Sequence, residues 1–421
     1  MDGDAPSSSS ALLPRKKAAR SPLRWLTLAA FCILTLNNSW MWITWSPVAA
    51  DVALRWNVSV AEVDALSSVF MWEYIPLSFP ALWLLHKIGM RRGLLLGALL
   101  NFAGSAIRWR CSHSYALVYV GTVFCSTAQL FTLAVPPLLS HVNFEVEERA
   151  LATSIGVLAN QLGTCAGLGA TIVADINTKG TLEYYLGVQS VMALVALVSI
   201  TAFVHHKPQA EPGEDEAETY LDSLKKIMSG EGLFLNLVYM IVVGVFYAVA
   251  TFLGQFLGGW PANDVGYLGI TLVLGGVVGS TISGVLLDRK VLAFYQMMRV
   301  LLFGGFLSSF LFSYAVTSPK QHALIFVATC CFGCFLTAVV SVGMEFGARI
   351  SPDSDEGIVA GVYNSFAQLG GCIFVWVGSG LLEQQQQPVL LWSFIGAMVV
   401  SGVLFQVGVG SLRVYSVERA E

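Results

Sequence analysis

Two polar side chains recur at equivalent places in otherwise apolar stretches of the sequence. Residues 159–165 read Ala-Asn-Gln-Leu-Gly-Thr-Cys and residues 366–372 read Phe-Ala-Gln-Leu-Gly-Gly-Cys, so Gln161 and Gln368 are separated by 207 residues within a repeated motif. An amide has two donor hydrogens and an acceptor to satisfy, and apolar surroundings satisfy none of them. A single such Gln is most simply explained as a hydrogen bond between helices. The matched pair favours a polar cavity that both amides line.

Aromatic residues mark a second candidate surface. Asn38, Trp42 and Trp45 have the spacing i, i+4, i+7, which predicts that they share one face of a helix. Phe246 and Tyr247 lie in the corresponding apolar stretch of the second repeat. Aromatic faces around a cavity bind ammonium groups through cation–π attraction, so the face that carries Asn38 and Trp42, and these two aromatic residues, are candidates for lining such a cavity. The alternative is an aromatic belt at the membrane interface. It fits Trp45 well, and for Trp42 alone it explains the residue as well as a binding role does.

Glu73 is an acidic residue inside the apolar segment 63–86, about 15 Å along a helix from its start at residue 63. A carboxyl group at that depth in a bilayer is unfavourable unless it faces a cavity, pairs with a cation or is protonated. Glu73 is therefore a candidate for proton or cation coupling. The alternative is a neutral, hydrogen-bonded structural carboxyl.

These side chains require apolar elements to hold them, and the sequence contains twelve. The chain has 421 residues, of which 55% are hydrophobic and 12% charged, and its mean hydropathy is +0.68. A soluble chain carries about 25% charged residues, so this composition indicates an all-α integral membrane protein. Stretches of about 20 residues predict twelve transmembrane helices: 25–48, 63–86, 93–109, 114–140, 150–173, 184–204, 233–256, 265–287, 293–316, 322–348, 357–381 and 389–411.

The polar segments divide the chain and orient it. We expect a disordered cytoplasmic tail at 1–24, a six-helix half at 25–204, a cytoplasmic loop at 205–232, a second six-helix half at 233–411 and a short cytoplasmic tail at 412–421. With the N-terminus inside, 17 of the 23 Lys and Arg residues fall on inner segments and 5 in outer loops. This asymmetry predicts that both termini are cytoplasmic. The net charge of −4 gives no support to a nucleic-acid partner.

Cysteine and histidine do not form a recognisable metal or cofactor site. Cys331 and Cys334 have the CxxC spacing but lie in an apolar run without a second ligand pair, which predicts buried, inert thiols. The six histidines fall in loops or at the ends of spans: His86, His113, His141, His205, His206 and His322. Haem would need an axial ligand at its site, so this distribution counts against a central haem site. We expect no metal and no cofactor.

Longer runs of the sequence are more specific. Among them are NNSWMWITWSPVA (37–49), CSTAQLFTLAVPPLLS (125–140), FYAVATFL (246–253) and MEFGARISPDSDEGIVAGVYNSFAQLGG (344–371). They resemble the feline leukaemia virus subgroup C receptor family, major facilitator transporters proposed to carry choline, ethanolamine and also haem. The resemblance implies that a cation sits among Trp42, Tyr247, Gln161 and Gln368. Glu73 departs from the family, which has a small neutral residue there, and this departure allows proton coupling.

The sequence after the eighth span, Gly284-Val-Leu-Leu-Asp288-Arg289-Lys290, resembles the loop signature of major facilitators. In that family the acidic residue bonds a neighbouring helix terminus, so the resemblance implies a conformational latch at Asp288 and Arg289.

The sequence and the resemblance together predict a transporter that moves a small organic cation by alternating access between its two halves. We expect a monomer in the lipid bilayer, in the plasma membrane rather than an internal one. The alternatives are a haem transporter of the same family and a proton-coupled carrier of another small organic solute. A non-transporting receptor would not need paired polar residues at the midplane. No nucleophile–base motif appears in the spans, so we do not expect an enzyme.

Overall fold

The computed structural model describes residues 23–169, 181–204, 224–258, 260–318, 322–351 and 356–409, and every regular element among them is a helix. The first group of helices comprises α1 (Leu23–Ile43), η1 (Ser46–Val48, a short 3-10 helix), α2 (Ala49–Trp56), α3 (Val60–Ile88), α4 (Met90–Arg110), α5 (Tyr115–Gln129), α6 (Val135–Asn143), α7 (Val146–Leu168) and α9 (Thr181–Phe203). The second group comprises α11 (Gly230–Phe256), α12 (Ala262–Asp288), α13 (Phe294–Thr317), α14 (His322–Ile350), α15 (Glu356–Glu383) and α16 (Gln387–Gly408).

Each of the twelve predicted spans overlaps at least one of these helices. Eight described helical segments are long and apolar enough to cross a membrane on their own: Leu23–Trp56, Thr181–Phe203, Gly230–Phe256, Asn263–Leu287, Phe294–Thr317, His322–Ile350, Ile358–Glu383 and Gln387–Gly408. The other predicted spans correspond to α3, α4, the α5–α6 pair and α7. The polar segments predicted at 1–24, 205–232 and 412–421 lie wholly or largely outside the described residues.

The fourth predicted span, 114–140, is wrong as a continuous helix. Helix α5 ends at Gln129 and α6 begins at Val135, with a turn between them. Pro136 and Pro137 follow at once, and proline suits the first turn of a helix because its missing N–H would be unpaired there anyway. By contrast, Pro76 and Pro80 lie inside α3 without ending it.

The junction between α2 and α3 is built by local hydrogen bonds. Asn57 adopts the left-handed conformation that closes α2. Ser59 and Glu62 then form a capping box at the start of α3: the Ser59 hydroxyl accepts from the Glu62 backbone N–H, and the Glu62 carboxylate accepts from the Ser59 N–H at 2.8 Å. This turn fixes where α3 begins and so sets the depth of every residue along it.

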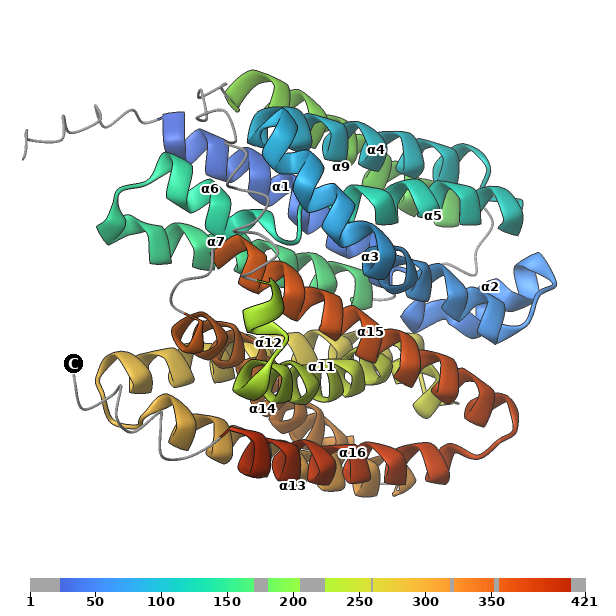
Figure 1. Cartoon of the computed structure of the whole chain (residues 1–421). Helices are drawn as coiled ribbons and strands as arrows, with labels where there is room; N and C mark the ends of the chain where they lie inside the picture. Colours follow the sequence, from blue (N-terminus) through green and yellow to red (C-terminus); the bar gives the residue numbers. More distant parts are fainter. Residues whose placement is uncertain are drawn as a thin grey trace, which may run out of the picture.

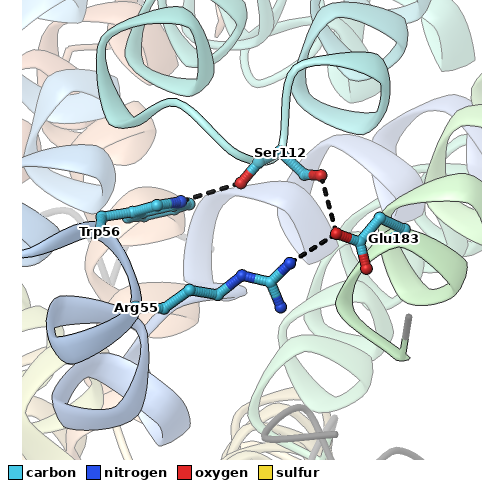
Figure 2. Close-up of polar contacts among 4 residues, drawn as sticks. All are labelled: Arg55, Trp56, Ser112 and Glu183. Atoms are coloured by element: carbon cyan, nitrogen blue, oxygen red, sulfur yellow. Dashed lines mark hydrogen bonds and ion pairs between the residues drawn. The ribbon is translucent and has the colours of Figure 1, made fainter. Parts of the chain in front are cut away.

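Four residues tie the first group together beside that turn (Figure 2). Arg55 of α2 forms an ion pair of 2.5 Å with Glu183 of α9, and Ser112 donates to the same carboxylate oxygen at 3.3 Å. The Trp56 indole N–H donates to the Ser112 carbonyl at 2.8 Å. We call this end of the bundle the α2 end. Helix α1 begins and α16 ends at the opposite end (Figure 1).

Two groups of helices lie side by side (Figure 1), and glycine lets the helices within each group approach closely. Gly163 of α7 lies against the Leu36 carbonyl of α1, and Gly333 of α14 against the Leu272 carbonyl of α12; a side chain at either glycine would overlap backbone atoms. Between the groups, α3 packs on α15, α7 on α12, and η1 on α11. We call this boundary between the two groups the seam, and Trp42, Tyr247, Gln161 and Gln368 lie along it.

Candidate functional site

An aromatic pair spans the seam. The rings of Trp42 on α1 and Tyr247 on α11 are 5.0 Å apart and nearly perpendicular, with an interplanar angle of 64°. Trp42 is 8% exposed, and its indole N–H is buried without a hydrogen-bond partner in the described part of the chain. Gly371 of α15 lies beside Tyr247 and Met71 of α3, so no side chain of its own fills that point. Two residues that are 205 positions apart in the sequence therefore form one contact.

Gln161 lies on the face of α7 that turns toward the second group of helices. It precedes Leu168 by seven residues, which is two helical turns, and Leu168 packs against Gly269 of α12. The face of α7 that packs on α1 is a different one, marked by Gly163 and by Thr164, whose hydroxyl is 2.8 Å from that of Ser39. The Gln161 side chain is half-buried.

Gln368 occupies the matching position on α15. It lies one turn from Ser365, whose hydroxyl is 2.9 Å from that of Ser78 on α3, and one turn from Gly371 beside Tyr247. Gln368 is buried, and none of the described residues hydrogen-bonds to its amide or to that of Gln161. Two amides facing the seam therefore keep their hydrogen-bonding capacity free, as the Trp42 indole does.

Asn38 does not join this set, although the spacing placed it on the same helix face as Trp42. Its amide donates to the Asn101 side chain of α4 at 2.9 Å and to the Cys125 carbonyl of α5 at 2.8 Å. Asn101 in turn donates to Asn37 at 2.9 Å. The structure therefore places the Asn38 amide inside the first group, where both of its donor hydrogens are used, and we leave it out of the site proposed below.

Glu73 lies on α3 and is half-buried, at the contact with α5. Its carboxylate accepts hydrogen bonds from the Ser126 and Thr127 hydroxyls, one at each oxygen. These donors carry no charge, and the ion pairs found among the described residues lie elsewhere. Glu73 thus has hydrogen-bond partners without a paired cation, so a coupling role for it stays a prediction.

The predicted latch lies at the opposite end of the bundle. Asp288 is the last residue of α12, and its side chain lies outside the described residues. Arg289 follows as the C-cap residue and is exposed. The latch therefore stays a prediction from the sequence.

Hydrogen bonds across the seam hold the α2 end closed, and sequence reasoning missed them. Asp64 of α3 is 4% exposed; both of its carboxylate oxygens accept from the Gln255 amide of α11 at 3.0 Å, and one also accepts from Ser379 of α15 at 3.1 Å. Ser46 of η1 donates to the Ala250 and Thr251 carbonyls of α11. No local spacing in the sequence indicates these contacts, because the paired residues are 191 to 315 positions apart.

Arg108 is one of the five basic residues that the charge count assigns to outer loops, and the structure contradicts that assignment. It is fully buried in the last turn of α4, its guanidinium lies 5.1 Å from the Trp45 ring centre, and it donates to the Met41 carbonyl at 3.1 Å. A cation stacked on an aromatic face and bonded to a carbonyl is stabilised without a carboxylate. Arg108 therefore belongs to the interior of the first group.

A family model and several relatives match most of this chain. The family model described as Major Facilitator Superfamily matches residues 26–375. Choline/ethanolamine transporter flvcr2a of Danio rerio is 30% identical over 382 residues, which cover 86% of this chain and 81% of the relative. The chain belongs to the feline leukaemia virus subgroup C receptor family of major facilitators. It is therefore a multi-pass membrane transporter of a small-molecule substrate.

Other relatives are similarly distant. Choline/ethanolamine transporter FLVCR1 of Felis catus is 29% identical over 92% of this chain and 74% of its own length. An uncharacterized MFS-type transporter of Caenorhabditis elegans is 30% identical over 84% of this chain, which spans 64% of that relative. Among solved structures, a D-xylose-proton symporter superposes with a TM-score of 0.70 over 93% of this chain and 98% of its own, at 12% identity. That likeness shows the major facilitator fold alone.

In major facilitators, the substrate site lies between two halves that rock against each other. The seam of this family member is that boundary, and the Asp64 and Ser46 contacts close it at the α2 end. The Trp42–Tyr247 pair and the two free amides line the same boundary.

The hydrogen bonds of Asn38 predict that this residue stabilises the fold and does not bind the substrate. Asn38→Ala should lower the free energy of unfolding by about 1–3 kcal/mol, because it leaves the buried Asn101 and Cys125 acceptors unpaired. Thermal unfolding of the purified protein measures this loss. Asn263→Ala, an exposed position on α12, is the matched control and should be near neutral. A weakened substrate affinity in Asn38→Ala with normal stability would instead return Asn38 to the binding site.

Proposed function

We propose that this transporter carries a small organic cation of the choline or ethanolamine type, bound between Trp42, Tyr247, Gln161 and Gln368. The observation that supports this most directly is the Trp42–Tyr247 pair, which brings two aromatic rings together from opposite sides of the seam. An ammonium group against such rings gains up to about 2 kcal/mol per ring when water is excluded. Relatives with 28–30% identity are named choline/ethanolamine transporters.

The free polar groups suit the other end of such a substrate. Choline and ethanolamine each carry a hydroxyl group two carbons from the nitrogen. That hydroxyl would accept from the unpartnered Trp42 indole N–H and exchange hydrogen bonds with the Gln161 and Gln368 amides. Binding would then satisfy groups that the protein leaves unsatisfied, which is a favourable exchange in an apolar interior.

Transport would follow from rocking at the seam. Opening of the α2 end requires the Asp64–Gln255, Asp64–Ser379 and Ser46–α11 hydrogen bonds to break. Each joins a neutral donor to a carboxylate or a carbonyl, so replacing it by hydrogen bonds to water costs only about 0.5–3 kcal/mol. Asp288 and Arg289 would latch the opposite end, as the loop signature implies.

We further propose a monomer in the plasma membrane with both termini cytoplasmic, on the basis of the Lys and Arg asymmetry. The α2 end would then face outside.

Haem transport is the alternative within the family. Haem would need an axial ligand, and two of the histidines lie at helix ends: His113 is in the loop after α4, and His322 begins α14.

Uptake by cells that express the protein tests the substrate. Labelled choline or ethanolamine should accumulate above the background of control cells, and haem should not. Trp42→Ala and Tyr247→Ala should each weaken binding by about 1–2 kcal/mol, roughly 5- to 30-fold, because each removes one aromatic wall. Gln161→Ala and Gln368→Ala should also impair transport.

Trp392→Ala is the matched control, because this tryptophan on α16 is 65% exposed. It should leave uptake unchanged at equal surface expression. Uptake of haem alone, or equal losses in Trp42→Ala and Trp392→Ala, would refute the proposed site.

Orientation is tested by labelling single cysteines with an impermeant thiol reagent in intact cells, in a variant whose native cysteines have been replaced. Residue 58, between α2 and α3, should react, and residue 215, in the central loop, should react only after the membrane is permeabilised. The reverse pattern would invert the topology.

Glu73 provides a separate test, of proton coupling. Glu73→Gln keeps the shape and the hydrogen bonds to Ser126 and Thr127 but removes the ionisable group. If Glu73 carries the coupled proton, the variant should bind substrate normally and lose the dependence of uptake on the pH gradient. Uptake at a series of external pH values measures this, with the exposed Glu345→Gln as control. Uptake by the unmutated protein that is indifferent to the gradient would exclude proton coupling.

A further inference from the structure

A cleft of about 260 Å³ lies between α3, α5 and α15, away from the Trp42–Tyr247 pair. Pockets for drug-sized ligands measure roughly 300–1,000 Å³, so this cleft suits a ligand of few heavy atoms. Its polar lining residues are Asp64, Ser68 and Ser379, and its aromatic ones are Trp72, Tyr119 and Trp376.

The charge in the cleft is not balanced by the protein. The Asp64 carboxylate accepts from Gln255 and Ser379, which are neutral donors. The ion pairs among the described residues are Arg24–Glu148, Arg55–Glu183 and Arg349–Glu345, and none of them includes Asp64. A buried carboxylate with hydrogen bonds but no counter-charge attracts a cation, because its neighbours stabilise it without neutralising it.

The walls favour an organic cation over a metal ion. Calcium and magnesium require six or more oxygen ligands, whereas the described residues contain no group of three His, Cys, Asp or Glu residues that could hold a metal. Three aromatic side chains instead line the cleft, and cation–π attraction suits an alkylammonium group. Trp72 and Trp376 are 54% and 74% exposed, so the cleft is accessible from the surface of the bundle.

We propose that this cleft is a second binding site, in which Asp64 and the aromatic walls hold the ammonium group of a small molecule or of a lipid headgroup. Asp64 is the fifth residue of the 29-residue helix α3, about 6 Å from its start; since this helix is about 43 Å long and a bilayer with its headgroups about 40–45 Å thick, Asp64 would lie at the headgroup level. The site is independent of the central one, since it shares none of the residues proposed there. It lies beside the hydrogen bonds that close the α2 end, and a cation on Asp64 would compete with Gln255 and Ser379 for the same two oxygens.

Binding of tritiated choline to the purified full-length chain tests the proposal. The double variant Trp42→Ala/Tyr247→Ala disables the central site, and in nanodiscs of phosphatidylglycerol it should still bind choline saturably. Tetramethylammonium should compete, and the neutral analogue of choline with carbon in place of nitrogen should not. Adding Asp64→Asn to the double variant should weaken this binding about tenfold, because it removes the charge and keeps an acceptor.

A second variant separates binding from the closure of the α2 end. Trp376→Leu removes an aromatic wall without touching the Asp64 hydrogen bonds, and it should weaken binding several-fold; Trp392→Leu on α16 is its matched control. The lipid source is distinguished by repeating the assay in phosphatidylcholine nanodiscs. Loss of choline binding there identifies a lipid headgroup as the occupant, whereas unchanged binding identifies a free cation.

Absence of saturable binding in the double variant would overturn the second site. So would binding that Asp64→Asn and Trp376→Leu leave unchanged in folded protein. The central site is tested separately, by uptake with the single variants, so failure of one proposal is not failure of the other.

Discussion

A polar group inside an apolar bundle has to find its partner within the protein, because lipid offers none. The first group of helices meets this constraint with a chain of amides. Asn38 donates to Asn101, Asn101 to Asn37, and Asn37 to the Gln189 carbonyl at 3.1 Å. The Gln189 amide then reaches Thr44 at 2.8 Å. These bonds join α1 to α4 and α9, and they hold fixed the helix that carries Trp42.

At the seam, by contrast, some polar groups have no hydrogen-bond partner. The Trp42 indole N–H and the amides of Gln161 and Gln368 have no partner among the described residues, although each faces the boundary between the two groups. Buried side-chain atoms without a partner also occur inside the first group, at Trp45 and Arg108, so the position of Trp42 and the two amides at this boundary is what would make them available to a ligand. The presence of hydrogen-bond partners separates Asn38 from Trp42, although they lie one helical turn apart.

The sequence predicts contacts that depend on local periodicity or on a repeat. Apolar length locates most of the long helices within a few residues, although it merges α5 with α6 and misses α2. The repeat marks Gln161 and Gln368 as equivalent positions, and the i, i+4 spacing of Glu345 and Arg349 predicts the ion pair found at 3.2 Å. Contacts fixed by tertiary packing are missed. The buried position of Arg108 depends on Trp45 from another helix, and the bonds of Asp64 reach residues 191 and 315 positions away.

The unpaired indole N–H of Trp42 has a consequence for selectivity. A site that holds a buried donor favours molecules that bring an acceptor and disfavours those that bring none, since the latter leave the donor desolvated at a cost of about 1–3 kcal/mol. Aromatic rings alone would accept any ammonium ion of suitable size. Because Trp42 also carries this N–H donor, the site would discriminate among ammonium ions by whether they supply an acceptor to the indole N–H. The strength of the cation–π contact would matter less for that choice.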